Sequence, residues 1–211
     1  MLRRRTRNST YVIVFAILAT VIVSSGAYVM LNAPPPERFF AMWILGSNGL
    51  AEHYYPNDNP NITVNEPVNW TLNVYNHMPS LEYVVVRVKL LNSTMASPNE
   101  TTGTPSPSSS LIEFTHVLIS NQTWSFPFNW VMTNVITEAR NITAVNELSI
   151  NQASFKGDLA ETKLGVNFRF VFELWFYDQN VDQLSFAWNV ANTRESVWTQ
   201  LWFNALAVST A

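Results

Sequence analysis

Residues 165–177, GVNFRFVFELWFY, alternate apolar side chains with a mixed set. A period of two is typical of a β-strand with one face in a core, because successive side chains point to opposite faces of the sheet. The predicted inner face consists of Val166, Phe168, Phe170, Phe172, Leu174 and Phe176. The predicted outer face consists of Asn167, Arg169, Val171, Glu173, Trp175 and Tyr177. We expect this segment to be the longest strand of the fold.

Shorter stretches with the same period lie elsewhere in the chain. Residues 68–75 and 84–91 alternate on either side of a turn at 77–80, which predicts an antiparallel hairpin. The strand that contains Pro127 is expected at a sheet edge, because proline has no N–H to donate to a ladder. Further strands are predicted at 38–45, 111–119, 124–130 and 197–205.

Two segments depart from this pattern. Residues 131–163 show no clear period, and only 145–150 is predicted as a short strand. Residues 93–110, STMASPNETTGTPSPSSS, carry three prolines and almost no hydrophobic side chain, which predicts a mobile loop. With about seven strands, polar turns and little helix, residues 38–211 are expected to form a single immunoglobulin-like β-sandwich domain.

An uncharged run, YVIVFAILATVIVSSGAYVML at 11–31, precedes the sandwich. At a rise of about 1.5 Å per residue, a helix of this length spans a hydrocarbon core of roughly 30 Å. Four arginines lie before it, so residues 1–10 are expected to form a cytoplasmic basic tail and the sandwich to lie outside the cell membrane. The prolines in 32–37 predict a stiff spacer. A cleaved signal peptide is the alternative, because the small residues at 24–27 suit a cleavage site.

Composition restricts the partners and the chemistry. Residues 32–211 contain 8 Lys+Arg and 15 Asp+Glu, a formal charge of 8 − 15 = −7, which argues against a nucleic-acid partner. The chain has no cysteine, which excludes disulfides, thiol nucleophiles and thiolate metal sites. An exported domain without disulfides depends on its core, and the 8 Trp, 13 Phe and 7 Tyr residues supply large side chains for one.

Six Asn-x-Ser/Thr motifs, the acceptors of N-linked glycans, follow the apolar run. They begin at Asn61, Asn69, Asn92, Asn99, Asn121 and Asn141. A seventh begins at Asn8, on the side predicted to be cytoplasmic, where no glycan is expected. Because Asn, Ser and Thr are all frequent, part of this number arises by chance. The six positions are therefore glycosylation candidates.

Residues 45–77, LGSNGLAEHYYPNDNPNITVNEPVNWTLNVYNH, resemble an archaeal envelope family known as domain of unknown function 1616. The shared motifs are Leu45-Gly46, Gly49-Leu-Ala-Glu52, Tyr55-Pro56, Val64-Asn-Glu-Pro67 and Asn76-His77. A looser match covers 172–177 and 201–204, and Met78 stands where the family commonly has an acidic residue. The resemblance implies a membrane protein with an exported immunoglobulin-like domain. It implies no activity and no catalytic residues.

Residues suited to catalysis or metal binding are few. His53, His77 and His116 are far apart and lack the spacing of a metal site. The Asn-Asp-Asn run at 57–59 is similar to the start of a calcium loop but lacks the Gly and the closing Glu of one. Neither a Gly-x-Ser-x-Gly motif nor a phosphate loop occurs. We expect no enzyme activity, no cofactor and no metal.

Outward aromatic side chains are the remaining functional signal. Trp175 and Tyr177 are candidates for an interaction surface, because Trp and Tyr contribute strongly to protein contacts. Packing of Trp175 beneath a loop or against a neighbouring chain is the alternative. The predicted function is a membrane-anchored, non-catalytic structural or protein-interaction module of the cell envelope, binding another envelope protein or itself. A carbohydrate-binding or other ligand-binding module is the second hypothesis. A concave strip of outward aromatics favours a ligand, and a flat face favours a protein contact.

Overall fold

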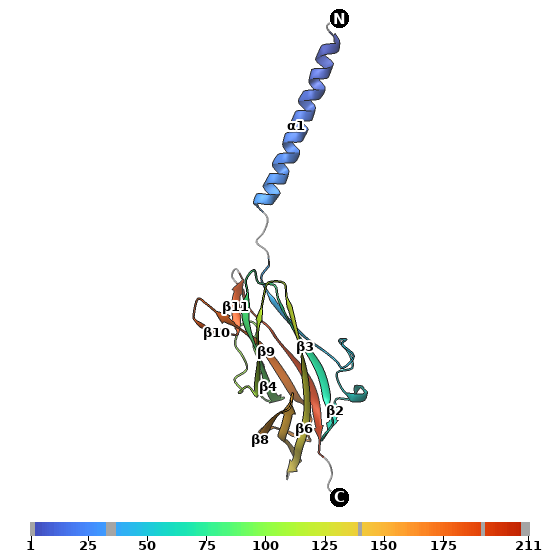
Figure 1. Ribbon diagram of the computed structural model, residues 1–211, viewed down its shortest axis with the longest axis vertical. Helices are drawn as coiled ribbons and strands as arrows, with labels where there is room; N and C mark the ends of the chain where they lie inside the picture. The colour runs from blue at the N-terminus through green and yellow to red at the C-terminus, as the bar shows by residue number, and fades with distance from the viewer. Residues whose placement is uncertain (1–2, 33–36, 139–140, 191–192, 208–211) are drawn as a thin grey trace. The chain divides into compact units, whose positions relative to one another are not determined.

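The computed structural model describes residues 3–32, 37–138, 141–190 and 193–207. The chain forms two compact units, Met1–Glu37 and Arg38–Ala211. The first contains the helix α1 (Arg3–Leu31), shown in Figure 1. Its part Thr10–Leu31 is long and apolar enough to cross a membrane, a property that a retained anchor and a signal sequence share. The prolines at 34–36, expected to form a stiff spacer, lie outside the described residues.

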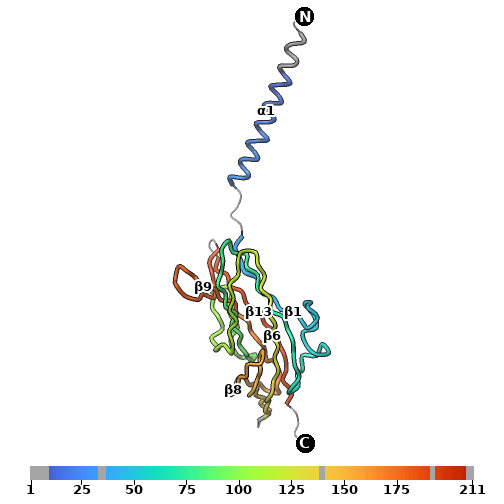
Figure 2. Tube along the Cα trace, viewed as in Figure 1, coloured from blue at the N-terminus to red at the C-terminus, as the bar shows by residue number. Residues whose placement is uncertain are grey.

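The second unit is a β-sandwich of two main sheets (Figure 1, Figure 2). The first sheet has the order β1 (Phe40–Leu45), β3 (Val68–Asn76), β6 (Thr123–Glu138), β7 (Ile142–Ile150) and β8 (Ala153–Lys163). The second sheet has the order β2 (Asn61–Thr63), β13 (Trp198–Leu206), β9 (Phe168–Asp178), β4 (Glu82–Asn92) and β5 (Ile112–Leu118). The smaller elements are a 3-10 turn at Pro56–Asp58, the strand β10 (Gln183–Ser185) beside β9, and a hairpin of β11 (Ala187–Val190) and β12 (Thr193–Ser196).

Seven of these strands make an immunoglobulin-like arrangement. In chain order they are β1, β3, β4, β5, β6, β9 and β13. The first, second and fifth lie together in one sheet, and the third, sixth and seventh lie together in the other, as in immunoglobulin-like sandwiches. The prediction of a mostly β chain with one amino-terminal apolar helix and such a sandwich is confirmed.

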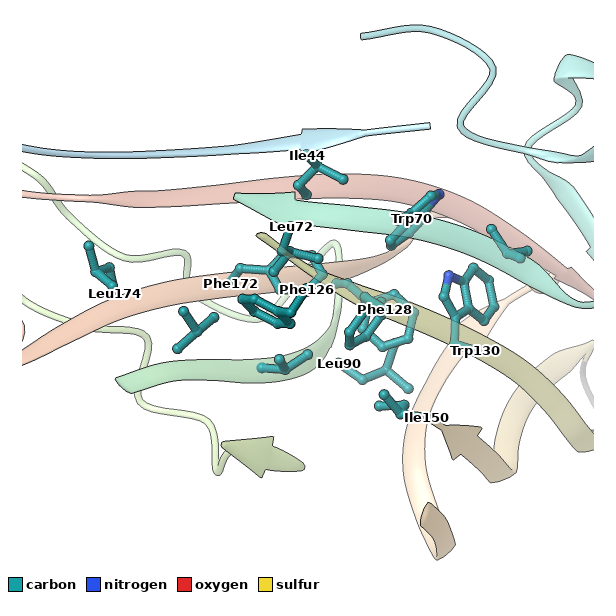
Figure 3. Packing of buried hydrophobic residues seen from close by; sticks show 14 of the residues in the cluster. Ile44, Trp70, Leu72, Leu90, Phe126, Phe128, Trp130, Ile150, Phe172 and Leu174 are labelled. Carbon is teal, nitrogen blue, oxygen red and sulfur yellow. The ribbon is translucent and has the colours of Figure 1, made fainter. Parts of the chain in front are cut away.

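The core forms where the inner faces of the two sheets meet. Phe168, Phe170 and Phe172 of β9 have no exposed surface, which confirms the predicted register of this strand. From the opposite sheet, Trp70 lies edge-on to Phe170 with ring centroids 5.9 Å apart, and Trp130 lies 5.0 Å from Phe170. Figure 3 shows Trp70 and Trp130 beside the other core side chains. Thus aromatic packing between the sheets takes the place of disulfides.

The predicted inner face is wrong at one end of β9. Val166 is 38% exposed and precedes the strand. Leu164 and Asn167, on either side of it, have positive φ values of 59° and 64°. A turn therefore interrupts the alternation before β9 begins.

The predicted hairpin of residues 68–75 and 84–91 is also wrong. β3 pairs with β1 and β6, whereas β4 pairs with β5 and β9 in the opposite sheet. The connection carries the chain across the sandwich, and Met78 within it is buried. Alternation identifies the buried face of a strand but contains no information about the partner strand, so two strands on opposite sides of one core look like a hairpin.

The edge position predicted for the strand that contains Pro127 is correct for only one half of that strand, β6. β6 lies between β3 and β7, so the strand as a whole is internal. However, β7 pairs with β6 only from Trp130 onward, and Pro127 lies in the half that β3 alone pairs with. On the open side, the side chain of Asn151 donates to the Pro127 carbonyl (2.8 Å) and accepts from the Asn129 N–H (2.8 Å). The backbone nitrogen of Pro127 therefore faces the open side, where no neighbouring strand requires an N–H donor.

Residues 131–163 contain more strand than predicted. β6 continues to Glu138, and β7 and β8 occupy most of the remainder. Register shifts lie between Met132 and Asn134 on β6 and between Val145 and Glu147 on β7. Each shift breaks the period of two, which explains why the sequence showed no strand pattern here.

Candidate interaction surface

The outer face of the second sheet contains Trp175 and Tyr177 and divides into two parts. Residues 93–110 cover the part toward the start of β9. The other part lies toward the end where the chain enters the sandwich, which we call the Arg38 end. β1 begins here with Phe40 opposite Asn76, and β4 begins here with Glu82 opposite Leu118.

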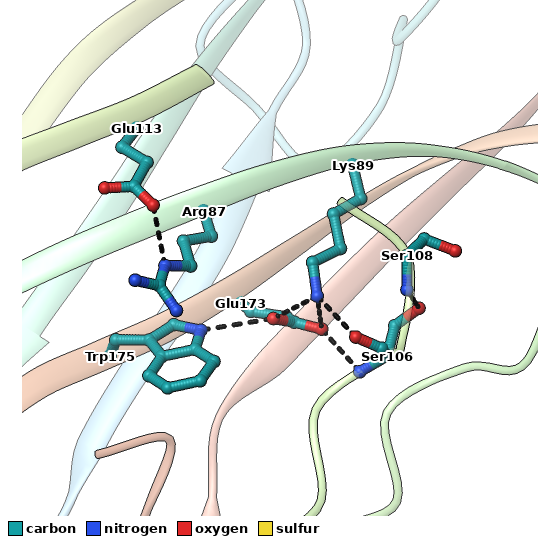
Figure 4. A network of polar contacts seen from close by, with 7 residues as sticks. All are labelled: Arg87, Lys89, Ser106, Ser108, Glu113, Glu173 and Trp175. Atoms are coloured by element: carbon teal, nitrogen blue, oxygen red, sulfur yellow. Dashed lines mark hydrogen bonds and ion pairs between the residues drawn. The ribbon is translucent and has the colours of Figure 1, made fainter. Parts of the chain in front are cut away.

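The covered part contains a buried ion pair. Lys89 Nζ lies 2.9 Å from the carboxylate of Glu173, and these side chains are 5% and 0% exposed. Lys89 also donates to the carbonyl of Ser106 (2.6 Å), and the Ser106 N–H donates to Glu173 (2.7 Å). Figure 4 shows Ser106 beside both charges, with its contacts to Lys89 and Glu173.

Trp175 is an extension of this network. Its indole N–H donates to Glu173 Oε2 (3.1 Å), and the guanidinium of Arg87 lies 4.0 Å above its ring. Arg87 in turn donates to Glu113 (2.7 Å), and Phe186 packs beside Trp175 with ring centroids 5.7 Å apart. Trp175 points outward, as predicted, but it is half-buried and has its contacts within the domain. This arrangement matches the alternative in which Trp175 packs beneath other parts of the chain.

Arg169, predicted on a solvated face, is only 5% exposed. It donates to Ser97 Oγ (2.8 Å), Gln200 Oε1 (3.0 Å) and the carbonyl of Met95 (2.6 Å), and it lies over the ring of Trp202. Burial lowers the pKa of this guanidinium. The outer face of β9 is therefore a second, polar interior.

Residues 93–110, expected to be a mobile loop, have defined positions on this face. Ser97 and Ser106 contact buried charges, and Asn99 forms a β-bridge with Thr104. A Cβ added at Gly103 would meet Arg194 and Ala187, so the segment also packs closely against the β11–β12 hairpin. Hydrogen bonds to buried charges hold residues 93–110 in place, although the segment has no apolar core of its own. The hydrophobicity of the sequence gives no sign of this kind of stabilisation.

The other part of the outer face carries a group of exposed apolar side chains that we call the apolar patch. It consists of Leu81, Tyr83, Val117, Ile119 and Tyr177, with exposed fractions of 57%, 41%, 47%, 57% and 37%. Tyr83 is paired with Val117 across β4 and β5. The β4–β9 ladder ends at Val84 and Phe176, which places the next residues, Tyr83 and Tyr177, side by side. The patch is therefore continuous over three neighbouring strands.

Tyr177 has one polar partner at the patch margin. Its hydroxyl donates to the carboxylate of Asp182 in the following turn. This hydrogen bond, followed by burial, raises the pKa of Tyr177 above 10.0, its ordinary value. The aromatic ring thus remains available for contact while the hydroxyl is occupied.

A cavity of about 550 Å³ lies beside the patch at the Arg38 end. Its lining includes Phe176, Trp188 and two arginines, Arg38 and Arg194, that make no hydrogen bond or ion pair with a described residue. Two acidic side chains, Glu82 and Asp178, also line it, and each accepts hydrogen bonds within its own turn. The cavity therefore combines an aromatic wall with two cations that no described residue pairs.

The three histidines lie in separate places. His53 bonds to Asp58 (2.6 Å), His77 to Asn121 (2.9 Å), and His116 stacks on Trp124 with centroids 4.8 Å apart. Over the part of the chain that the structure describes, no three His, Asp or Glu side chains gather as metal ligands.

The glycosylation candidates differ in how free their amides are. Asn69 is exposed on the outer face of β3, and its side chain makes no hydrogen bond to a described residue. In contrast, the Nδ2 atom of Asn92 donates to the carbonyl of Glu161 (2.9 Å), and that of Asn61 donates to Asn59 (2.9 Å). The Oδ1 atoms of Asn99 and Asn121 accept hydrogen bonds. Asn141 lies exposed in the turn before β7.

The exposed tryptophans do not form a strip. Trp43, 37% exposed, lies on β1 of the first sheet, whereas Trp202, 39% exposed, lies on β13 of the second. The exposed aromatic residues that do lie together, Tyr83 and Tyr177, are on neighbouring strands of one sheet face. By the criterion set from the sequence, this arrangement favours a protein contact.

No protein-family model and no curated protein matches the sequence. Several solved structures are similar in fold. The CARDB domain of a Pyrococcus furiosus protein, solved with di-metal ions, is 11% identical with a TM-score of 0.38, over 80% of this chain and 89% of that one. A β-glucosidase from Listeria innocua, solved with glucose, is 7% identical with a TM-score of 0.38, over 81% of this chain and 17% of that one. The C-terminal domain of wzt is 7% identical with a TM-score of 0.34, over 81% of this chain and 79% of that one. Likeness of this degree assigns no family and no activity.

Proposed function

We propose that this chain is a single-pass, membrane-anchored module of the cell envelope that binds another protein and catalyses no reaction. Its amino terminus lies in the cytoplasm and its sandwich outside, as the arginines before α1 favour. Membership of the family of domain of unknown function 1616, which the motifs in 45–77 resemble, is part of this proposal. The helix supplies attachment, and the sandwich supplies the binding surface.

The proposal rests on the contrast between a covered part and an exposed part of the outer face of the second sheet. Residues 93–110 cover one part of it, while the apolar patch is bare next to it. Contiguous exposed apolar side chains mark interaction surfaces in soluble domains, and tyrosine is enriched where proteins meet. The patch is therefore the surface that we expect a partner to cover.

Crosslinking in native membranes tests the binding role. With Tyr83→Ser and Val117→Ser together, we expect a defined crosslinked product to disappear while the melting temperature stays nearly unchanged. The matched control is Leu164→Ser, because Leu164 is 66% exposed and lies before β9, away from the patch. A product that persists in the patch variant, or that the control also loses, contradicts the proposal.

Membrane topology is tested by a separate labelling experiment. Single cysteines can be introduced for it because the chain has no cysteine of its own. A membrane-impermeant maleimide should label Leu206→Cys in intact cells and leave Asn8→Cys unlabelled. Labelling of Asn8→Cys alone would place the sandwich in the cytoplasm. Amino-terminal sequencing of the mature protein distinguishes a retained anchor from a cleaved signal peptide.

The cavity supports a second candidate function, the binding of a carbohydrate with a carboxylate group. Arg38 and Arg194 on its walls have no side-chain partner among the described residues, and Trp188 offers an aromatic surface for a sugar ring. Titration calorimetry with oligosaccharides of glucuronic acid tests it. Binding that Arg38→Gln with Arg194→Gln abolishes would favour this function, and no measurable heat would exclude it for that ligand class.

A further inference from the structure

We propose that the apolar patch binds the same patch of a second copy of this chain anchored in the same membrane, so that two copies form a symmetric pair. The inference rests on the proposed function, because it takes the patch as the binding surface and α1 as the anchor. It adds the identity of the partner.

The composition of the patch suits contact with itself. Its five side chains are three aliphatic residues and two tyrosines, and none is charged. In a two-fold interface each side presents the same surface, so a charged patch would place like charges against each other. Aliphatic and tyrosine side chains meet without that repulsion and exclude water from both copies.

Most of the charges around the patch are paired or line the cavity. Arg87, which follows Tyr83 on the same outward face, is paired with Glu113 at 2.7 Å. Asp182 accepts the hydroxyl of Tyr177, and Glu82 and Asp178 line the cavity. Because residues 32–211 carry a formal charge of 8 − 15 = −7, two copies repel each other over most of their surface. The patch itself carries no acidic side chain, and Asp182 lies at its margin.

The chain between helix and sandwich is short, and its length is the same in every copy. From Leu31 to Arg38 there are seven residue steps, which reach at most about 25 Å when fully extended. The patch lies at the Arg38 end of the sandwich, the end that the connecting segment enters. In the proposed pair, a two-fold axis along the membrane normal relates the two patches.

Anchoring also lowers the affinity that such a contact requires. Two chains confined to one membrane meet at a high effective concentration, so a small interface is sufficient for association. The same interface between sandwiches free in solution would dissociate readily. Dimerisation is thus expected to depend on α1.

Disulfide crosslinking of the full-length chain in liposomes tests the pairing. Since the chain has no cysteine, each of the five patch residues is replaced singly by Cys, and the proteins are reconstituted at equal density and oxidised. We expect at least one patch variant to form covalent dimers about tenfold faster than the control Leu164→Cys, which is more exposed than any patch residue but lies away from the patch. Rates no higher than that of the control at all five positions would overturn the pairing.

Further variants identify the occupant if it is not a second copy. Adding Tyr83→Asp to the fastest crosslinking variant, or Val117→Asp where the cysteine stands at position 83, should abolish the dimer. Adding Asp at Leu164 should leave it unchanged, and a dimer that survives the patch substitution overturns the proposal. A fluorophore on Ile119→Cys that nitroxide-bearing lipids quench, without dimers, would assign the patch to the bilayer. A crosslink that forms only in native membranes, to a different protein, would overturn the pairing and leave the proposed function standing.

Discussion

Single positions on β9 show how one strand supports two interiors. Phe172 points into the aromatic core, while the next residue, Glu173, points to the opposite face and is equally buried. Its carboxylate accepts hydrogen bonds from Lys89, Ser106 and Trp175. A buried charge persists only where such partners replace water. Residues 93–110 supply part of that replacement.

We expect Lys89→Met to destabilise the domain by about 3–5 kcal/mol, because it leaves the Glu173 carboxylate buried and unpaired. The free energy of unfolding from chemical denaturation measures the loss. The matched control is Lys156→Met, which breaks the exposed Lys156–Glu147 pair (3.1 Å) and should change stability by less than about 1 kcal/mol. Recovery of stability in Lys89→Met with Glu173→Leu would support the same cause. Equal small losses in both single variants would show that water reaches Glu173.

His53 provides a pH-dependent contact on the surface. Its hydrogen bond to Asp58, together with the charge of that carboxylate, raises the pKa of His53 above 6.5. A raised pKa means that the contact stabilises the fold at low pH and that this contribution is lost as the pH rises through the raised pKa. A titration followed by NMR should find the midpoint above 6.5, and Asp58→Asn should lower it. A midpoint that does not move in the variant would contradict the pairing.

At the scale of elements, β9 holds the sandwich together through both of its faces. It pairs with β4 on one side and with β13 and β10 on the other. Its inner residues meet the first sheet, and its outer residues hold residues 93–110 in place. The strand that the sequence indicated most strongly is therefore central to the fold on two sides, and only one of them was predicted.

Substitutions on the two faces of β9 measure how much each face contributes to the stability of the domain. Phe170→Ala should destabilise the domain by about 3–5 kcal/mol, because it empties a site in the aromatic core. Arg169→Ala should cost about 2 kcal/mol, since it removes charge-assisted hydrogen bonds to Ser97, Gln200 and Met95. Thermal and chemical denaturation provide both values. A loss below about 0.5 kcal/mol for Arg169→Ala is the behaviour of a solvated residue and would contradict its burial.

At the scale of the whole molecule, an acidic sandwich is joined to an apolar helix by a short segment. The formal charge of 8 − 15 = −7 on residues 32–211 keeps the sandwich soluble, while the apolar patch provides a place for contact. The glycosylation candidate Asn121 lies two residues from Ile119 of the patch, whereas Asn69 lies on another sheet. Asn69, on β3, belongs to the first sheet.

Glycan occupancy is testable when the chain is exported by a host that attaches N-linked glycans. We expect Asn69→Gln to lower the mass by one glycan, because its amide is exposed and free of hydrogen bonds to described residues. Asn92→Gln should leave the mass nearly unchanged, since its Nδ2 atom is engaged with Glu161. Mass spectrometry of the two variants measures whether each position carries a glycan. Loss of a glycan in Asn92→Gln, with none lost in Asn69→Gln, would reverse this ranking.

The site was predictable in part. Tyr177 was singled out from the alternation in 165–177, and it belongs to the apolar patch. Leu81, Val117 and Ile119 were not singled out, because an isolated aliphatic residue near a turn carries no signal until the sheet brings several together. Trp175 was chosen for pointing outward, and it does, but residues distant in sequence occupy the space above it.

The sequence by itself determined the apolar helix, the β class and the inner faces of the main strands, because side-chain periodicity is a local property of the backbone. Only the tertiary structure decided that β3 and β4 lie in opposite sheets, since pairing joins residues that local periodicity does not relate. It also decided that Arg169 and Glu173 are buried, because the atoms that pair with them come from residues 93–110 and from β4 and β13. The outward face of a strand becomes an interior or a binding surface according to what the rest of the chain lays over it.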